Sequence, residues 1–487
     1  ADPVDRAYAA ALLANVDGDR AAQVEAVAAG FSELDRQQQL CSSAEMRVRL
    51  THRGRALRDI AARTAIADRD PSALLESVEL SRMRTGGYSA APNSAETRRL
   101  LAELRDVRVA LREAQLAGSP SDELSARARN LEQATIRSQR REAGSSVRPE
   151  AAAEVDLASL PSMLGDRTVV SYVVSDSQLW AVRSARDGFE LVELGDLGAV
   201  ERLARAQRTV LRRLSSAVGG NGADLDLLST INEELDQLLM SGIRFGDDHA
   251  VTIAPAHQLS HISWSGLPSL IDREVSITPS LRVWLSGETG LTIETVGLLG
   301  GPDLDQAGDE LRSLADVWAG TGPRISPEAS VDEATDALRS CDLAHLAAHG
   351  TFRSDNPHFS SIEFADGPLT VFDLEDISPL PRMVFLASCD GAAASGSNRH
   401  DPVGTTAVLL RLGVSAVLAP TAIVDDGAAR RFSVDFHHRL REGCSPERAV
   451  LAARSAALMR GRPEDLAAAQ AFQLHGRRSS GGAVVLP

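Results

Sequence analysis

The sequence is poor in cysteine and in aromatic residues. Its 487 residues include four cysteines, and Phe, Trp and Tyr together make up 4% of the chain. Cys41, Cys341, Cys389 and Cys444 lie far apart and form no C-x-x-C pair, which argues against a disulfide framework and against a zinc site. An isolated cysteine remains a thiol in a reducing compartment, so this composition predicts a cytoplasmic protein.

Long apolar runs and an excess of basic charge are also lacking. No run reaches the ~20 residues that a membrane-spanning helix needs, and the first residues, ADPVDRAYAA, lack the basic and apolar regions of a signal peptide. The chain begins with Ala1 rather than Met, so we expect it to be processed, trimmed or tagged at that end. The formal net charge of -16 argues against nucleic-acid binding, which normally uses a clustered basic surface. We therefore expect neither a membrane nor a nucleic acid as a partner.

Cofactor and metal motifs are missing as well. The sequence contains no P-loop, no dinucleotide fingerprint and no cluster of metal-ligating residues. No acidic loop has the spacing of a calcium site. We therefore expect no obligatory cofactor and no metal ion.

The N-terminal part of the chain, up to about residue 145, reads as helix. Residues 1–90 are rich in Ala, Leu, Arg and Glu, with breaks at NVDGDR, ADRDPS and RTGGYS. Segments of this kind favour paired helices of a degenerate tetratricopeptide (TPR) type, although no clean repeat period is present.

Residues 91–145 predict a charged helical hairpin. Asn93 and Glu96 have the spacing of a capping box, and AGSPSDE separates two apolar stripes. A narrow stripe predicts two antiparallel helices packed along a seam, whereas packing on a globular core needs a wider one. EAGSSVRPEAAAEVD, residues 142–156, predicts a linker. The stripe residues are Leu100, Leu104, Val107 and Leu111, then Leu124, Ala128, Leu131 and Thr135.

Residues 157–487 predict a mixed α/β domain with an N-terminal subregion at 157–290 and a catalytic subregion at 291–487. RTVVSYVVSDSQLWAVRS and FELVELG alternate and are rich in β-branched residues, which predicts antiparallel strands. Later apolar runs, such as DLAHLAAHG, MVFLASC and VSAVLAP, alternate with helical segments. The fold class is therefore α/β, a mostly parallel sheet covered by helices and preceded by an all-α region.

Two of these strand-like runs end on a reactive side chain. CDLAHLAAHGTF leads to His349 and Gly350, and MVFLASCDGA leads to Cys389. The carboxyl ends of parallel strands meet at one edge of a sheet, where functional residues gather. On neighbouring strands, the imidazole of His349 can take the thiol proton and the thiolate can attack a carbonyl carbon. Gly350 lets the backbone approach a substrate, so that its N–H and that of Cys389 can form an oxyanion hole.

The same residue types have plainer interpretations. A single cysteine after an apolar strand is often an inert buried thiol. A histidine in a strand is often structural, which is how we interpret His345. The pairing of His349 with Cys389 on consecutive strand ends favours catalysis over these alternatives.

The sequence around these residues resembles the CHAT family of caspase-like, clan CD cysteine peptidases, which are usually fused behind TPR or other helical repeats. DLAHLAAHGTFRSDNPHFSSIEFADGPLTVFDL, followed by PRMVFLASCDGA, carries the most specific part of the resemblance. VTIAPAHQLSHISWSGLPSL, ITPSL, GTTAVLLRLGVSAVLAPTAIVDDGAARRF and AAAQAFQLHG extend it to roughly residues 160–487. VELSRMRT and the charged hairpin resemble the region ahead of such domains more weakly. The resemblance implies a catalytic dyad of His349 and Cys389, with Gly350 at the oxyanion hole.

The chain departs from the basic-specific relatives of that family. Metacaspases carry an aspartate two residues before the cysteine, where this chain has Ala387, so cleavage after Arg or Lys loses its usual support. The remaining candidates for acids of a substrate pocket are Asp355, Asp390, Asp425 and Asp426. Asp390 is alternatively a turn residue. Either Asp425 or Asp426 is alternatively a helix N-cap, which we favour for that pair.

The function that these features favour is a cysteine endopeptidase of narrow specificity. The resemblance implies a protein substrate and a role in bacterial defence or programmed cell death, and a protein partner or ligand at the helical region is the expected activator. Two alternatives remain: a degenerate CHAT scaffold that binds partners without cutting, and an adaptor whose helical region is the active part. The presence of both His349 and Cys389 favours the peptidase, because a scaffold needs neither.

Overall fold

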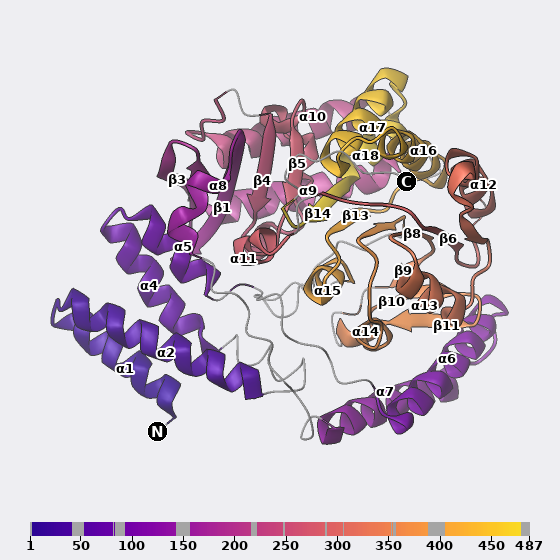
Figure 1. Ribbon diagram of the computed structural model, residues 1–487, viewed down its shortest axis with the longest axis horizontal. Helices are drawn as coiled ribbons and strands as arrows, with labels where there is room; N and C mark the ends of the chain where they lie inside the picture. The colour runs from indigo at the N-terminus through magenta and orange to yellow at the C-terminus, as the bar shows by residue number, and fades with distance from the viewer. Residues whose placement is uncertain are drawn as a thin grey trace.

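The computed structural model places helices around one large sheet (Figure 1). It describes residues 2–40, 53–80, 82, 93–142, 156–215, 222–246, 249–287, 290–304, 306–351, 353, 357–387 and 405–478. The N-terminal helices separate into two groups, one beside the β1–β3 end of the sheet and one beside the β9–β11 strands (Figure 1). No helix in the described part of the chain is both long and apolar enough to cross a bilayer.

Eleven of the described strands form one mostly parallel sheet. They are β1 (Arg167–Ser175), β2 (Gln178–Ala185), β3 (Gly188–Asp196), β4 (Ala250–Ala254), β5 (Glu274–Ile277), β6 (Val296–Gly300), β7 (Arg324–Ser326), β8 (Leu343–Ala347), β12 (Met383–Leu386), β13 (Ala416–Pro420) and β14 (Phe472–Gly476). Their order is β3-β2-β1-β4-β5-β14-β13-β12-β8-β6-β7. Neighbours are parallel except at β3–β2, β2–β1 and β14–β13. The predicted fold class is confirmed, and so is the antiparallel pairing of the first strands.

A second, three-stranded antiparallel sheet follows β8, and sequence analysis missed it. It consists of β9 (Gly350–Thr351), β10 (Ser361–Phe364) and β11 (Gly367–Thr370), in the order β11-β10-β9. The strands are two to four residues long, too short to produce a recognisable alternation. Because β9 begins at Gly350, this sheet is joined directly to His349.

Helices cover the large sheet on both faces. They are α1 (Pro3–Val16), α2 (Arg20–Leu40), α4 (Arg55–Ala67), α5 (Pro71–Glu79), α6 (Ala95–Leu116), α7 (Asp122–Glu142), α8 (Leu160–Met163), α9 (Leu197–Leu214), α10 (Gly222–Met240), α11 (Leu281–Leu285), α12 (Ala307–Val317), α13 (Val331–Ser340), α14 (Val371–Glu375), α15 (Thr405–Leu412), α16 (Asp426–Arg441), α17 (Pro446–Arg460) and α18 (Pro463–Ala471). Helices α9, α10, α12, α16, α17 and α18 share one core with one face of the sheet. On the other face, α13 and α15 pack over β8, β12 and β13, while α4, α5 and α11 pack over β1, β2 and β4.

Helix α5 is part of the core of the sheet domain, although the predicted linker separates them in sequence. Its Leu74 and Leu75 are fully buried with Val169 of β1 and Trp284 of α11. The interpretation of α1, α2, α4 and α5 as degenerate TPR helices remains a prediction, and so do the domain boundaries.

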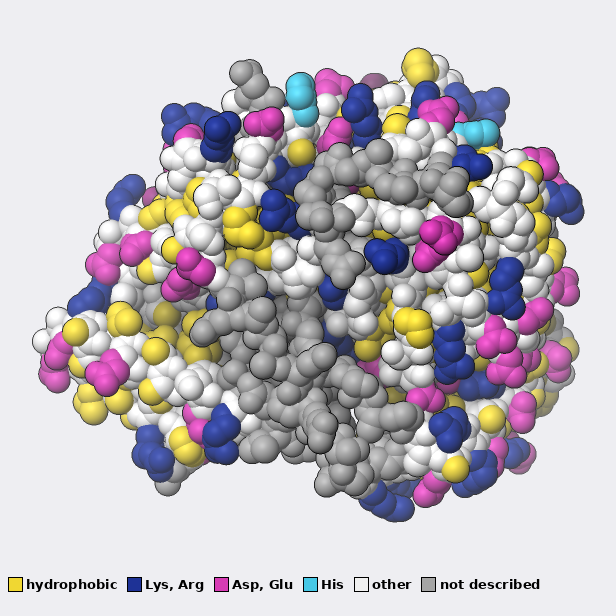
Figure 2. Space-filling model, in the orientation of Figure 1, with side chains coloured by type: hydrophobic (Ala, Val, Ile, Leu, Met, Phe, Trp, Pro, Cys, Tyr) yellow, Lys and Arg dark blue, Asp and Glu magenta, His cyan; other side chains and the backbone are white. Residues whose placement is uncertain are grey.

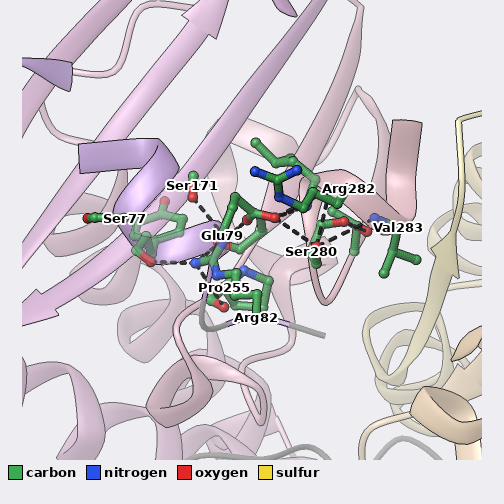
Figure 3. Close-up of polar contacts among 12 residues, drawn as sticks. Ser77, Glu79, Arg82, Ser171, Pro255, Ser280, Arg282 and Val283 are labelled. Carbon is green, nitrogen blue, oxygen red and sulfur yellow. Dashed lines mark hydrogen bonds and ion pairs between the residues drawn. The ribbon is translucent and has the colours of Figure 1, made fainter. Parts of the chain in front are cut away.

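A buried ion pair fixes the end of α5 to the sheet (Figure 3). The carboxylate of Glu79 accepts hydrogen bonds from Ser280 Oγ at 2.7 Å and from the N–H of Leu281 at 2.8 Å, at the start of α11. It pairs with Arg82 Nη1 at 2.9 Å, and Arg82 Nη2 donates to the carbonyls of Tyr172 and Ala254 at 2.7 and 3.2 Å. A buried carboxylate and a buried guanidinium are thus satisfied together, as a low-dielectric interior requires.

Helices α6 and α7 form the predicted hairpin, but they also dock on the sheet domain. Their leucine stripe packs with Phe359 and with Phe372 of α14, so packing on a globular core, which the narrow stripe disfavoured, is present as well. The two phenylalanine rings cover only a small area, so a narrow apolar stripe on the hairpin is wide enough to pack against them. The capping box is wrong: Ser94 caps α6 by accepting from the N–H of Thr97, while Asn93 Nδ2 donates to the carbonyl of Phe372.

Basic and acidic side chains are interspersed on the face of the molecule shown in Figure 2. Apolar side chains gather at the left of that view, over the N-terminal helices (Figure 2). Among the exposed ones are Leu13 and Val16 of α1 and Val24 of α2. In this view the described surface carries no large patch of one sign.

Candidate active site

The two strands that lead to the predicted dyad are parallel neighbours, as expected. β8 and β12 pair from Leu343 with Met383 to Leu346 with Leu386. His349 stands three residues after Leu346 in the sequence. Cys389, three residues after Leu386, lies outside the described residues, as do Asp355 and Asp390. Both strands are fully buried, so the end of β8 and the end of β12 come level at one edge of a rigid sheet.

His349 is exposed at this edge, and a backbone carbonyl orients its ring. Nε2 of His349 lies 3.2 Å from the carbonyl oxygen of Asp303. A carbonyl oxygen can only accept, so the contact requires the hydrogen on Nε2. In the neutral ring Nδ1 is then the nitrogen with a free lone pair, which a general base needs.

The position of Asp303 depends on the glycines that end β6. The N–H of Gly301 donates to the carbonyl of Ala347 at 2.8 Å, which brings the loop after β6 against the end of β8. A Cβ on Gly301 would lie 2.4 Å from the carbonyl oxygen of Glu363 and 2.7 Å from Cβ of Ala348. Only glycine fits here. Sequence analysis did not identify Asp303, although the Gly-Gly-Pro-Asp that follows an apolar run was a usable signal.

Gly350, the predicted oxyanion-hole residue, opens strand β9. It stands opposite Ile362 of β10, and the N–H of Glu363 donates to the carbonyl of His349 at 2.8 Å. This pattern makes Gly350 and Ile362 a non-hydrogen-bonded pair, in which the peptide groups point away from the partner strand. The N–H of Gly350 therefore points away from β10.

Asp425 and Asp426 lie after β13, the strand next to β12. Asp425 is the N-cap of α16 and accepts from the N–H of Ala428 at 2.9 Å. Asp426 lies in the first turn of the same helix. The cap that we favoured for this pair is thus present at Asp425, and the role of either residue in a substrate pocket remains a prediction.

A buried polar chain joins His345 of β8 to side chains of α12 and α16. The indole N–H of Trp318 donates to Nδ1 of His437 at 3.0 Å, so neutral His437 carries its hydrogen on Nε2, 3.1 Å from Nδ1 of His345. Nε2 of His345 lies 3.2 Å from a carboxylate oxygen of Glu310, an ion-pair separation. Burial lowers the pKa of His437 well below its ordinary value, and His345 adds to the effect. His345 is fully buried, as its interpretation as a structural residue requires.

Two of the four cysteines, Cys341 and Cys444, lie in the described part of the chain. Cys341 is buried, and burial raises the pKa of its thiol, while Cys444 is a partly exposed free thiol at the C-terminal end of α16. Among the residues that the structure describes, no group of three or more His, Cys, Asp and Glu side chains is arranged to hold a metal ion.

Comparison with solved structures identifies the same fold in the separase–securin complex of Saccharomyces cerevisiae. Two crystal structures, at 3.0 and 2.6 Å resolution, match with TM-scores of 0.52 and 0.50 at 11% sequence identity. The matches cover 93% and 95% of this chain, but only 37% and 38% of the matched chains. This chain therefore spans little more than a third of the proteins it resembles, and the likeness concerns the caspase-like fold.

Comparison with curated proteins gave no match. The CHAT domain, by contrast, matches residues 203–474, more than half of the chain. This range includes the ends of β6, β8, β12 and β13, where the candidate site lies. The chain belongs to the CHAT family.

Proposed function

We propose that this protein is a cysteine endopeptidase with a dyad of His349 and Cys389. The observation that carries the proposal is the orientation of His349: its Nε2 is held by the carbonyl of Asp303, at the end of a strand paired in parallel with the strand that leads to Cys389. A structural histidine would be buried among fixed partners, as His345 is. His349 is instead exposed at the sheet edge where α/β proteins bind ligands.

The reaction follows from these groups. Nδ1 of His349 accepts the thiol proton of Cys389, and the thiolate attacks the carbonyl carbon of the scissile peptide. The N–H groups of Gly350 and Cys389 stabilise the negative charge that develops on the carbonyl oxygen. As the C–N bond breaks, the imidazolium returns the proton to the leaving amine, and water then hydrolyses the thioester.

The substrate in this proposal is a specific protein rather than a range of peptides. The family context suggests bacterial defence or programmed cell death in the cytoplasm, with a protein partner or ligand activating the enzyme through its helical region. The related yeast structures are complexes of separase with securin, which supports control by a bound protein. A pocket acid at Asp355, Asp390, Asp425 or Asp426 is part of the same proposal.

The test compares protein cleavage in cells that express the wild type, Cys389→Ala or His349→Ala. Mass spectrometry of new protein N-termini should find cleavage products that require the wild type and disappear with either variant. Cys41→Ala, Cys341→Ala and Cys444→Ala should retain the products. A Cys389→Ala variant that still produces them would refute the assignment of the nucleophile.

A further inference from the structure

The hairpin of α6 and α7 reaches the segment that follows His349. Arg353, four residues further on, donates from Nη1 to Oε1 of Glu132 on α7 at 2.9 Å and from Nη2 to Oε2 at 3.3 Å. Such two-pronged pairs between a guanidinium and a carboxylate fix direction as well as distance. Arg108 of α6 pairs with the same carboxylate. Glu132 is only 5% exposed. It therefore connects both helices of the hairpin to the segment that follows His349, the candidate general base.

Short backbone links connect Arg353 to His349. The N–H of Arg353 donates to Ser360 Oγ at 3.1 Å, just before β10. Thr351 pairs with Ser361 of β10, and the carbonyl of His349 accepts from Glu363 at 2.8 Å. His349, Thr351 and Arg353 are thus all bonded to β10 or to the residue before it, and Arg353 is one point at which the hairpin contacts this segment.

The hairpin also holds the far side of the small sheet. Arg105 of α6 pairs with Asp373 of α14 at 2.9 Å, and a Cβ on Gly367 at the start of β11 would lie 3.0 Å from Cβ of Arg105. The N–H of Asn93 donates to Asp376 at 2.9 Å. The hairpin therefore contacts β11 and α14 at one edge of the three-stranded sheet and Arg353, after β9, at the other edge.

We infer that Glu132 is a positioning residue for the dyad: through Arg353 and strand β9, it holds the imidazole of His349 in the direction that presents Nδ1 to Cys389. The inference rests on the proposed function. Without the carboxylate, Arg353 loses its two-pronged contact with Glu132 of the hairpin, and the position of the backbone after His349 is less well determined. A small misplacement of a catalytic base costs far more in rate than the same movement costs in stability.

The chain offers a matched control in Glu79. Glu79 and Glu132 are both buried carboxylates in N-terminal helices, and each pairs with one or more arginines. Glu79, however, anchors α5 beside β1 and β4, far along the strand order from β8. Changes at the two sites should cost similar stability, but only Glu132 is linked to His349.

The experiment measures the alkylation rate of Cys389 in the full chain as a function of pH, with iodoacetamide as the probe and peptide mass spectrometry as the readout. In the wild type, proximity to His349 should place the midpoint below the ordinary thiol pKa of about 8.5, and His349→Ala should restore that value. Glu132→Gln should raise the midpoint by about one unit, which slows alkylation about tenfold at a pH below both midpoints. Glu79→Gln should leave the midpoint at the wild-type value.

Two further variants separate positioning from folding. Arg353→Gln removes one of the two arginine partners of Glu132, at a more exposed site, and leaves Arg108 in place. It should produce the same shift, and the double variant should shift the midpoint no further than either single one. A Glu132→Gln or Arg353→Gln midpoint equal to that of the wild type, while His349→Ala differs, would overturn the inference and leave the dyad standing. An equal shift in Glu79→Gln and Glu132→Gln would also overturn it. If the wild type and His349→Ala share one midpoint, the proposed dyad itself fails.

Discussion

Replacing Glu79 with Gln tests whether the N-terminal helices belong to the folding unit of the sheet domain. Gln has nearly the same shape as Glu but no charge. The variant keeps an acceptor for Ser280 Oγ and for the backbone N–H groups at the start of α11. It leaves Arg82, which is itself 9% exposed, without the charge that balances it.

The size of the effect follows from burial. Glu79 is fully buried, and removing one partner of a buried ion pair costs about 3–5 kcal/mol, because the remaining charge stays in the low-dielectric interior. The carbonyls of Tyr172 and Ala254, which accept from Arg82, offset part of this cost, so we expect the lower end of the range. Glu76→Gln, on the exposed side of the same helix, is the matched control and should change little.

Urea denaturation with two probes measures both the size and the extent of the effect. The tryptophans report on the sheet domain, because all four follow residue 157, and Trp284 also reports on its contact with α5. They are Trp180, Trp264, Trp284 and Trp318. Far-UV circular dichroism also reports on the N-terminal helices. Because α5 shares a core with Trp284, both transitions should move to lower urea together in Glu79→Gln. An unchanged midpoint, or a shift in circular dichroism alone, would show that α5 is not an integral part of the core.

Two further predictions concern the surroundings of His349. Gly301→Ala should reduce substrate cleavage more than tenfold, because the new Cβ would collide with the carbonyl of Glu363 and displace the loop that orients the imidazole of His349. Gly308→Ala is the control and should retain activity, because its Cβ would meet only open space and one flexible arginine. Equal cleavage rates for the two variants would contradict the argument. Burial holds the pKa of His437 below its ordinary value, so below about pH 6.5 the unfolded chain takes up a proton that the folded chain does not, and the free energy of unfolding should fall by up to about 1.4 kcal/mol per pH unit. Urea titrations across that range should show a shallower dependence in His437→Gln, and an identical slope in both proteins would contradict it.

Short-range patterns in the sequence were enough to assign several of the strands. Short and mainly apolar runs such as Leu343–Ala347 and Met383–Leu386, which alternate with helical segments, indicated strands covered on both faces. Alternating runs at residues 167–196 were correctly assigned to antiparallel strands. Because strand side chains follow a period of two and helices a period of 3.6, such segments identify their own structure and their own buried faces.

Once the α/β fold was assigned, the sequence also predicted that His349 lies at the carboxyl edge of the sheet. Parallel strands in an α/β sheet present their carboxyl ends at one edge, so two runs that end on reactive residues define a candidate site. The register between Leu346 and Leu386 agrees with that expectation. Cys389 follows Leu386 by three residues, and His349 follows Leu346, the partner of Leu386, by three residues as well.

The groups that surround His349, by contrast, come from distant parts of the chain and could not be predicted from local patterns. The carbonyl of Asp303 arrives from β6, more than 40 residues earlier, and Glu132 arrives from a helix more than 200 residues before Arg353. Any residue can supply a backbone carbonyl, so the residue type at position 303 does not reveal this role. One glutamate in a charged helix also cannot be distinguished by sequence pattern from the other charged residues around it. Local periodicity encodes which face of an element is buried, but not which distant element covers it, and that choice is made when the elements pack together.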